Sequence, residues 1–380
     1  MDKIFIITGD ISGDMHGAFL AKSLLKKEPH LQIFGMGGEK MKAAGIKVLF
    51  DLTQFSLMGF VEVARHIVLF RRVLYQLIAK IKIEQPDAIV FIDYPGFNLR
   101  LAEKIKPLSI PLIYYISPQV WAWGKNRIKK IASLFSRMIV ILPFEKELYE
   151  KEGLSAFFVG HPLLDVVKTT GLMNQVPTIS NGRASSATTI TLLPGSRSCE
   201  VRRLLPVMVK LAQLIKEKKP ETQFIILAAS SLMEKEIEKI LKKKKISLRV
   251  TRERKYGIIK SSALALTASG TATVEIAILE RPMIIFYKVS PFAYLFLKKM
   301  VKLPYIGMVN IIAKKEIVPE FIQGRANAEK ILPTALALLE QKEKREKMSE
   351  QLRRVKKSLG NPGAADRAAE IILKEARNIL

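Results

Sequence analysis

An aspartate stands where a carboxylate could do acid–base chemistry in the first half of the chain. Residues 91–98 read Phe-Ile-Asp-Tyr-Pro-Gly-Phe-Asn, so Asp93 follows a predicted buried strand and precedes a rigid turn. A carboxylate there can take a proton from a sugar hydroxyl if partial burial adjusts its pKa and the hydroxyl comes within hydrogen-bond reach. We therefore interpret Asp93 as a candidate general base; the alternative is an aspartate that only caps a turn or a helix.

A glycine-rich turn follows the first predicted strand, over residues 9–18. Glycines let the backbone approach a ligand closely, and the start of a helix offers free N–H groups. Ile11 and Asp14 stand where a dinucleotide fingerprint needs its second and third glycines, so this is a different kind of turn. A turn that merely needs small residues is the alternative. The polar side chains that could contact an acceptor or a sugar here are Asp10, Ser12, Asp14 and His16.

Both tryptophans of the chain lie in residues 117–124, again after a predicted strand. Large amphipathic rings such as Trp121 and Trp123 can stack on a sugar or line the path of an acyl chain. Packing anchors are the more common fate of such a pair, and the sequence leaves both interpretations open.

Two turns in the second half have the residue types that bind phosphate. In residues 193–197, Leu-Pro-Gly-Ser-Arg, the guanidinium of Arg197 and the N–H groups around Ser196 could bind phosphate oxygens. In residues 268–275, the small polar loop suits a diphosphate and Glu275 suits ribose hydroxyls, although an acid near a helix start is also explained by the helix dipole. The loop residues in question are Ser269, Gly270 and Thr271.

Short apolar runs alternate with amphipathic segments and predict two successive parallel α/β sheets, in which ligands bind beyond the carboxyl ends of the strands. Strands are expected over residues 3–8, 31–36, 88–93, 111–116, 137–142, 156–159, 189–193, 223–228, 247–250, 263–267 and 283–287. We expect an N-terminal domain over 1–167, a linker over 168–188 and a second domain over 189–340. Helices are predicted over 341–380, and the sequence leaves open whether they return to the first domain.

The charge balance indicates an anionic partner. The chain has 62 Lys plus Arg against 35 Asp plus Glu, a net charge of +27, which suits nucleic acid, anionic lipid or phosphorylated substrates. No nucleic-acid module accompanies the lysines at 242–245, so we expect no nucleic-acid binding. The single cysteine, Cys199, excludes an intramolecular disulfide and fits a reducing cytoplasm.

Two segments favour attachment to a membrane surface. A helix predicted over 62–83 carries basic side chains beside its apolar face, and the segment 291–302 runs from aromatic and aliphatic residues into lysines. No run approaches the ~18 uncharged residues that a membrane span needs. The side chains expected to contact lipid or acyl chains are Phe292, Leu295, Phe296 and Leu297.

Taken together, these motifs resemble the lipid-A-disaccharide synthase family along nearly the whole chain. The segments that carry the resemblance are residues 12–14, 58–63, 117–123, 142–145, 160–162, 193–197 and 269–271. The resemblance implies a glycosyltransferase B-type fold, with two Rossmann-like domains facing a cleft. It implies transfer of 2,3-diacylglucosamine from its UDP derivative to the 6-hydroxyl of 2,3-diacylglucosamine 1-phosphate, with inversion and without metal or cofactor.

The resemblance also assigns individual residues. Asp93 matches the family's proposed catalytic aspartate, Arg197 its phosphate-binding arginine and Asn310 the asparagine of a late UDP-binding segment. The chain departs from relatives at Asp10, where many have Glu, and at Gly96, where some have a second Asp. That second departure removes a rival base.

The implied setting is the cytoplasmic face of the inner membrane of a Gram-negative bacterium, with the protein attached peripherally to an anionic surface. The sequence leaves open whether the chain forms a homodimer. The main alternative is another UDP-sugar enzyme of the same fold, either a cell-wall glycosyltransferase or a UDP-N-acetylglucosamine epimerase.

Overall fold

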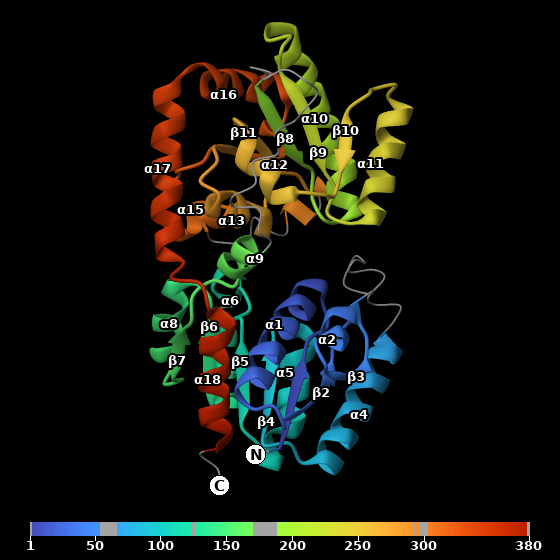
Figure 1. Ribbon diagram of the computed structural model, residues 1–380, viewed down its shortest axis with the longest axis vertical. Helices are drawn as coiled ribbons and strands as arrows, with labels where there is room; N and C mark the ends of the chain where they lie inside the picture. Colours follow the sequence, from blue (N-terminus) through green and yellow to red (C-terminus); the bar gives the residue numbers. More distant parts are fainter. Residues whose placement is uncertain are drawn as a thin grey trace. The chain divides into compact units, whose positions relative to one another are not determined.

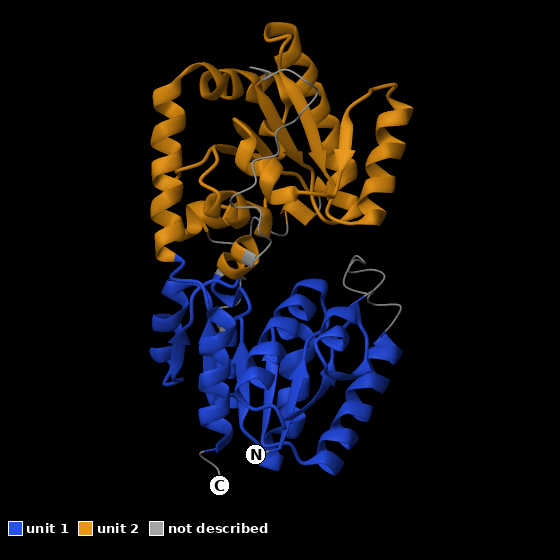
Figure 2. Cartoon of the chain, in the orientation of Figure 1, with its two compact units in different colours: residues 1–162, 359–380 blue, residues 163–358 orange. Residues whose placement is uncertain are grey.

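The computed structural model describes residues 2–53, 67–123, 126–169, 188–291, 293–295 and 303–377. The chain divides into two compact units, which Figure 2 shows in different colours. Unit 1 comprises Met1–Pro162 with Leu359–Leu380, and unit 2 comprises Leu163–Ser358. The final helix therefore belongs to unit 1, whereas the helix before it belongs to unit 2.

Unit 1 is built on a seven-stranded parallel sheet in the order β3-β2-β1-β4-β5-β6-β7. Its strands are β1 (Lys3–Ile7), β2 (Gln32–Met36), β3 (Lys47–Phe50), β4 (Ala88–Ile92), β5 (Leu112–Tyr115), β6 (Arg137–Val140) and β7 (Ala156–Phe158). The order reverses between β1 and β4, which makes this place the switch point of the sheet. The connections that leave these two neighbouring strands diverge there and open a crevice for ligands at the carboxyl ends of the strands.

Unit 2 repeats this plan with a six-stranded parallel sheet in the order β10-β9-β8-β11-β12-β13. Its strands are β8 (Thr189–Leu193), β9 (Gln223–Leu227), β10 (Arg249–Thr251), β11 (Leu264–Ala268), β12 (Met283–Tyr287) and β13 (Glu320–Ile322). Here the order reverses between β8 and β11. The eleven predicted strands are confirmed, and the structure adds two short strands at sheet edges, β3 and β13, that the sequence pattern does not predict.

Helices cover both faces of the sheet in unit 1 (Figure 1). They are α1 (Ile11–Lys27), α2 (Glu39–Ala43), α4 (Ile67–Glu84), α5 (Pro95–Ile105), η2 (Lys106–Leu108), α6 (Val120–Trp123), α7 (Asn126–Leu134), α8 (Pro143–Glu150) and α18 (Ala364–Arg377). One core cluster joins α4, α5 and α7 to the sheet, and the other joins α1 and α18 to its opposite face. Because Ala368 and Ile372 of α18 are fully buried in that second cluster, the end of the chain completes the core of unit 1.

In unit 2, helices alternate with the strands along the chain from β8 to β13, and α9 precedes the first of these strands. They are α9 (Leu163–Thr169), α10 (Ser198–Lys218), α11 (Ser231–Lys243), α12 (Lys255–Ser261), α13 (Thr271–Ile278), α15 (Met308–Ala313), η3 (Gln323–Arg325), α16 (Ala328–Glu340) and α17 (Lys342–Ser358). In the part of the chain that the structure describes, no helix has the length and apolar character to cross a bilayer.

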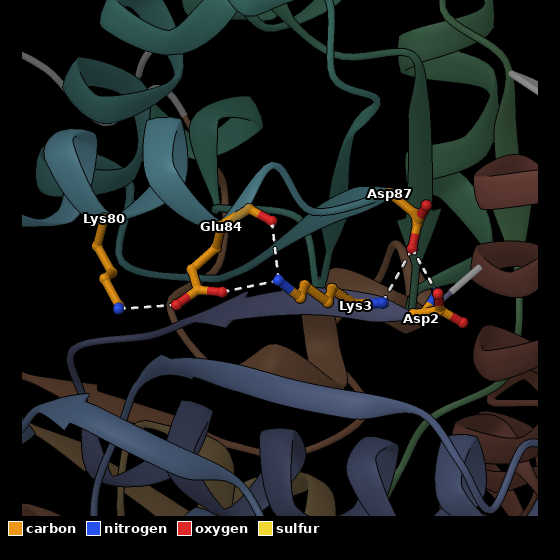
Figure 3. A network of polar contacts seen from close by, with 5 residues as sticks. All are labelled: Asp2, Lys3, Lys80, Glu84 and Asp87. Carbon is orange, nitrogen blue, oxygen red and sulfur yellow. Dashed lines mark hydrogen bonds and ion pairs between the residues drawn. The ribbon is translucent and has the colours of Figure 1, made fainter.

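A polar network fixes the amino end of the unit 1 sheet, the edge opposite the ligand crevice (Figure 3). Glu84 at the end of α4 pairs with Lys3 at 2.9 Å and with Lys80 at 2.7 Å, and these contacts lower the pKa of its carboxyl to about 2. Asp87 accepts hydrogen bonds from the backbone N–H groups of Asp2 and Lys3. The network thus ties the start of β1 to the connection that enters β4, the two strands that flank the switch point.

Candidate active site

Two loops meet at the switch point of unit 1. In the register of the sheet, Ile7 pairs with Phe91, so the residues that follow β1 and β4 lie side by side. The loops are in close contact, because a Cβ added at Gly9 would lie 2.3 Å from the ring of Tyr94. Glycine is therefore required at this position for the two loops to approach. The structure brings the glycine-rich turn and Asp93 together, as expected from their positions after the two strands.

Asp93 sits in a sharp turn between β4 and α5. Its φ is +43° and that of Tyr94 is +49°, so two successive non-glycine residues have left-handed backbone conformations. Aspartate adopts the left-handed conformation more readily than most residues do, whereas tyrosine does not. A non-glycine residue in this conformation destabilises the folded state by on the order of 1–3 kcal/mol. Pro95 then begins α5. The turn presents the half-buried Asp93 side chain at the carboxyl edge of the sheet.

The surroundings of Asp93 give it the protonation behaviour of a base that works near neutrality. Burial and, to a smaller extent, the neighbouring charge of Asp10 raise the pKa of its carboxyl to about 7, against the opposing effect of a hydrogen bond from the backbone of Tyr94. A pKa near the working pH is the optimum for a general base.

The glycine-rich turn is organised by two capping aspartates. Asp10 accepts a hydrogen bond from the backbone N–H of Gly13 at 2.6 Å and so caps α1. The carboxylate of Asp14 is buried and accepts hydrogen bonds from the N–H groups of Gly38, Lys40 and Met41, which caps α2. The Asp14 carboxylate thus stabilises the start of α2, and the hypothesis that it contacts a substrate is not carried further. Ser12, in contrast, is exposed in the first turn of α1.

His16 is buried, with 6% of its surface exposed, so the hypothesis that it contacts a sugar is not supported. Burial and, to a smaller extent, the charge of Lys40 lower the pKa of its imidazole to about 4. His161, which is also buried, has its pKa lowered to about 3 by burial and by His16. Both rings are therefore neutral at physiological pH and pack inside unit 1.

Trp121 is part of a buried network at the carboxyl ends of β5 and β6. Only 8% of its surface is exposed, and its indole N–H donates to Oε1 of Glu145 at 3.0 Å. Burial raises the pKa of Glu145 to about 8. Ser117 and Tyr149 share a hydrogen bond of 2.7 Å beside this pair. The burial and the hydrogen bond favour Trp121 as a packing anchor over the alternative that it stacks on a sugar. Glu145 stands in the segment 142–145 that carries the family resemblance, but the sequence pattern gives it no role.

The switch point of unit 2 also brings two motifs together. Leu193 of β8 pairs with Thr267 of β11, so the loop 194–197 lies beside the loop 269–271. Each loop leads into a helix, α10 or α13, whose first N–H groups face the carboxyl edge of the sheet. The exposed residues at this edge are Ser196, Arg197, Gly270 and Thr271.

The starts of the two helices differ in how their N–H groups are used. At α10, the Glu200 carboxylate accepts hydrogen bonds from the N–H groups of Ser196 and Arg197 and pairs with the Arg197 side chain at 3.5 Å. At α13, the cap residue is Gly270, and no side chain among the described residues caps the helix. An uncapped helix start with an exposed glycine is an open site for an anion. The sequence pattern does not indicate this capping role of Glu200.

Glu275 and Asn310 face inward rather than toward a ligand. Glu275 accepts a hydrogen bond from Tyr256 at 2.9 Å and pairs with Lys255 at 2.5 Å, which joins α13 to α12. Its two carboxylate oxygens are thus occupied, and the ribose role expected for it is not carried further.

Asn310 is fully buried, and its carboxamide is fully hydrogen-bonded inside unit 2. The side chain donates to the backbone oxygen of Val318 and to Glu320, and it accepts from the N–H groups of Ile317 and Val318. These bonds leave no free polar group on the Asn310 side chain, so the expectation that it binds UDP is not carried further. Ser269 is similarly turned inward, because its hydroxyl donates to the backbone oxygen of Ile306 at 3.0 Å.

Several predicted contacts lie outside the described residues. They are Phe292, Phe296 and Leu297, together with the side chain of Trp123 and the first part of the helix expected over 62–83. Of the proposed lipid contacts, Leu295 is described, and 62% of its surface is exposed.

The chain matches, over residues 4–375, the model of a family described as lipid-A-disaccharide synthetase. It is 42% identical over 371 residues to the lipid-A-disaccharide synthase of Syntrophus aciditrophicus, with 97% of each chain covered. Among solved structures, it resembles the UDP-GlcNAc 2-epimerase of Methanocaldococcus jannaschii in complex with UDP-GlcNAc and UDP, with a TM-score of 0.64, 17% identity and coverage of 98% and 99%. A calicheamicin glycosyltransferase gives a TM-score of 0.62 at 13% identity, with coverage of 100% and 99%. These two structures confirm the predicted fold class, a B-type pair of Rossmann-like domains.

Proposed function

The chain belongs to the lipid-A-disaccharide synthetase family and is a glycosyltransferase, and we propose that its two switch points divide the transfer between a base in unit 1 and a nucleotide site in unit 2. The donor is UDP-2,3-diacylglucosamine and the acceptor is 2,3-diacylglucosamine 1-phosphate. The observation that carries the proposal is the half-buried Asp93 at the β1/β4 switch point, with its pKa raised to about 7.

In the proposed reaction, the Asp93 carboxylate accepts the proton of the acceptor's 6-hydroxyl while that oxygen attacks C1 of the donor sugar. The bond between C1 and the diphosphate oxygen breaks, and its electron pair leaves with UDP. Attack from the face opposite the leaving group inverts C1 and gives a β-1,6 linkage. A base is needed because a sugar hydroxyl is a weak nucleophile until its proton is removed.

The role of unit 2 is to stabilise the charge that develops on the leaving UDP. No side chain in the described part of the chain caps the start of α13, where Gly270 and Thr271 are exposed, and Arg197 before the neighbouring helix adds a cation with 61% of its side chain exposed. Oriented N–H groups and a guanidinium are effective donors to diphosphate oxygens. Gly270, Thr271 and Arg197 are therefore the proposed diphosphate contacts.

The test is an assay of the purified chain with both acylated substrates, in which UDP release and the disaccharide product are measured together. We expect UDP to appear only when donor and acceptor are both present, in equal amount to the disaccharide. Two control reactions contain the donor alone and UDP-N-acetylglucosamine alone. UDP release without acceptor, or epimerisation of UDP-N-acetylglucosamine with no disaccharide formed, would contradict the proposal.

We also propose that the protein attaches to the anionic inner-membrane surface without spanning it. Support comes from exposed apolar side chains beside cations: Val68 on α4 is 75% exposed next to the exposed Arg71 and Arg72, and Leu295 is 62% exposed. Apolar side chains that enter the headgroup region add burial, and each cation near an anionic surface adds ~1 kcal/mol.

Vesicle co-sedimentation tests this attachment. Wild type should bind vesicles that contain anionic lipid, release in high salt and bind neutral vesicles weakly. A variant with Phe292, Leu295, Phe296 and Leu297 changed to Ser should bind less, whereas Leu232→Ser, which alters a 53% exposed leucine on α11, should bind as wild type does. Equal binding by all three folded proteins would remove the 292–297 segment from the membrane contact.

A further inference from the structure

We propose that Asn98 and Tyr114 are positioning residues that hold the catalytic Asp93 in place through its backbone carbonyl. The proposal rests on the role of Asp93 as base, and it gives a function to two buried polar side chains that the transfer reaction does not otherwise use. Neither side chain is proposed to touch a substrate, since both are fully buried.

Two donors converge on a single oxygen. The hydroxyl of Tyr114 donates to the backbone oxygen of Asp93 at 2.6 Å, and Nδ2 of Asn98 donates to the same oxygen, also at 2.6 Å. The Asn98 amide reaches back further, to the backbone oxygen of Ile92 at 3.3 Å. One donor comes from the first turn of α5 and the other from β5, so the Asp93 carbonyl is fixed from two separate elements.

These bonds hold a backbone that would otherwise relax. Asp93 and Tyr94 both have positive φ, a conformation that persists in non-glycine residues only where the surroundings enforce it. Rotation about the N–Cα bond of Asp93 toward an ordinary negative φ would turn its carbonyl and its side chain together, and it would swing the carbonyl away from both donors. The two donors therefore favour the one backbone conformation that presents the carboxylate at the switch point.

The anchors themselves are rigid. The ring of Tyr114 packs edge-on against Phe135, with centroids 4.8 Å apart, and lies 6.4 Å from Phe91. Asn98 is held at the start of α5, where its N–H bonds to the backbone oxygen of Tyr94. Because neither anchor can follow a shifted carbonyl, the position of Asp93 is set by the sheet and the helix rather than by the loop.

Asn98 does not have the contacts of a residue kept for stability alone. Within the described part of the chain, its Oδ1 is buried and has no hydrogen-bond partner. A buried acceptor without a partner destabilises the folded state, so an apolar residue would suit this site better if only packing mattered. What asparagine supplies here is its pair of N–H donors, aimed at the carbonyls of Ile92 and Asp93.

The test is a double-mutant cycle between Tyr114 and Asp93. Tyr114→Phe keeps the ring and removes the donor, and we expect kcat to fall about tenfold with KM and UDP affinity within about twofold, because small displacements of a catalytic group cost ~10²-fold or less. In an Asp93→Asn background the same change should cost nothing further, since its effect passes through the carboxylate. Asn98→Ala, which removes the other donor, should behave in the same way.

Tyr115→Phe is the matched control. Tyr115 is the next residue of β5, is equally buried and belongs to the core cluster on the opposite face of the sheet. The Tyr115→Phe variant should keep wild-type kcat even if the change lowers its melting temperature. The inference is overturned if Tyr114→Phe and Asn98→Ala keep wild-type kcat while Asp93→Asn is inactive, or if their effects add in full to that of Asp93→Asn. Retention of turnover by Asp93→Asn would instead remove the proposed base itself.

Discussion

The two switch points of this molecule have the same topology but opposite construction. At the β1/β4 point in unit 1, Asp93 is half-buried, in a strained turn, and its carbonyl is held by two buried donors. At the β8/β11 point in unit 2, Arg197, Gly270 and Thr271 are exposed, and the start of α13 is uncapped. One fold therefore supports one site that is closed and fixed and another that is open.

The difference follows from the chemistry that each site is proposed to do. A carboxylate base gains its raised pKa from burial and from a neighbouring like charge, and it must be placed within hydrogen-bond reach of one proton. A diphosphate site needs free donors and access for a large anion, and burial would only raise the cost of removing water from both partners. Substitutions should therefore act on turnover in unit 1 and on nucleotide affinity in unit 2.

The largest expected effect is that of Asp93→Asn on turnover. The change keeps the size of the side chain and removes the proton acceptor, so kcat should fall ~10²-fold or more. Steady-state kinetics measures this, with circular dichroism as the check on folding. A folded variant that keeps more than about a tenth of wild-type kcat would show that the base lies elsewhere.

The pH profile should carry the signature of the same residue. Because only the ionised Asp93 accepts a proton, kcat/KM should rise with pH up to about pH 7 and then level, with close to tenfold loss per pH unit below that point. Asp10→Asn keeps a good helix cap but removes the neighbouring charge that raises the pKa of Asp93, so the midpoint should move to lower pH. An unchanged midpoint would mean that the Asp10 charge does not affect the pKa of Asp93.

A smaller effect is expected at Arg197. Arg197→Ala should weaken UDP binding by about tenfold, a value typical of the loss of one charge-assisted hydrogen-bonding partner. Calorimetry gives the affinity directly. Arg202→Ala is the control, because Arg202 lies on the same helix with 66% of its side chain exposed and pairs with Glu236. If both variants bound UDP equally well, Arg197 would have no part in the nucleotide site.

The last effect is on stability, and its sign tests the raised pKa of Asp93. The pKa of Asp93 is raised on folding, so the folded state binds this proton more tightly, and stability falls as pH rises from about 4 to about 7. Asp93→Asn should therefore be more stable than wild type above pH 7, by on the order of 1–3 kcal/mol, and equal to it near pH 4. Thermal melts at both pH values test this. A variant less stable than wild type at pH 8 would contradict the raised pKa.

The sequence predicts the candidate site residues that follow strands, but it does not show which polar partners a residue contacts in the folded chain. Asp93 directly follows β4 and Arg197 lies four residues after the end of β8, so both become candidates from strands whose apolar runs are visible in the sequence. Asn98 stood in a quoted motif without a role, because the positive φ of Asp93 that exposes its carbonyl is not visible in the sequence. Tyr114 could not be paired with Asp93 before the order of β4 and β5 was known.

The roles that are not carried further have the same origin. The family resemblance implies that Asn310 binds UDP, but residues 317–320 supply its hydrogen-bond partners through a fold-back that has no periodic signal. For Trp121 the sequence leaves stacking and packing open, and the hydrogen bond from its indole to Glu145, 24 residues later in the chain, favours packing. Polar partners distant in sequence decide whether a motif residue faces a ligand or the core.

The most direct test of the division between the two units is UDP affinity measured by calorimetry on Asp93→Asn beside Arg197→Ala. We predict that Asp93→Asn binds UDP within about twofold of wild type despite its lost turnover, whereas Arg197→Ala binds about tenfold more weakly. If Asp93→Asn lost UDP affinity as severely as Arg197→Ala, the carboxylate would belong to the nucleotide site, and the assignment of proton transfer to unit 1 would be wrong.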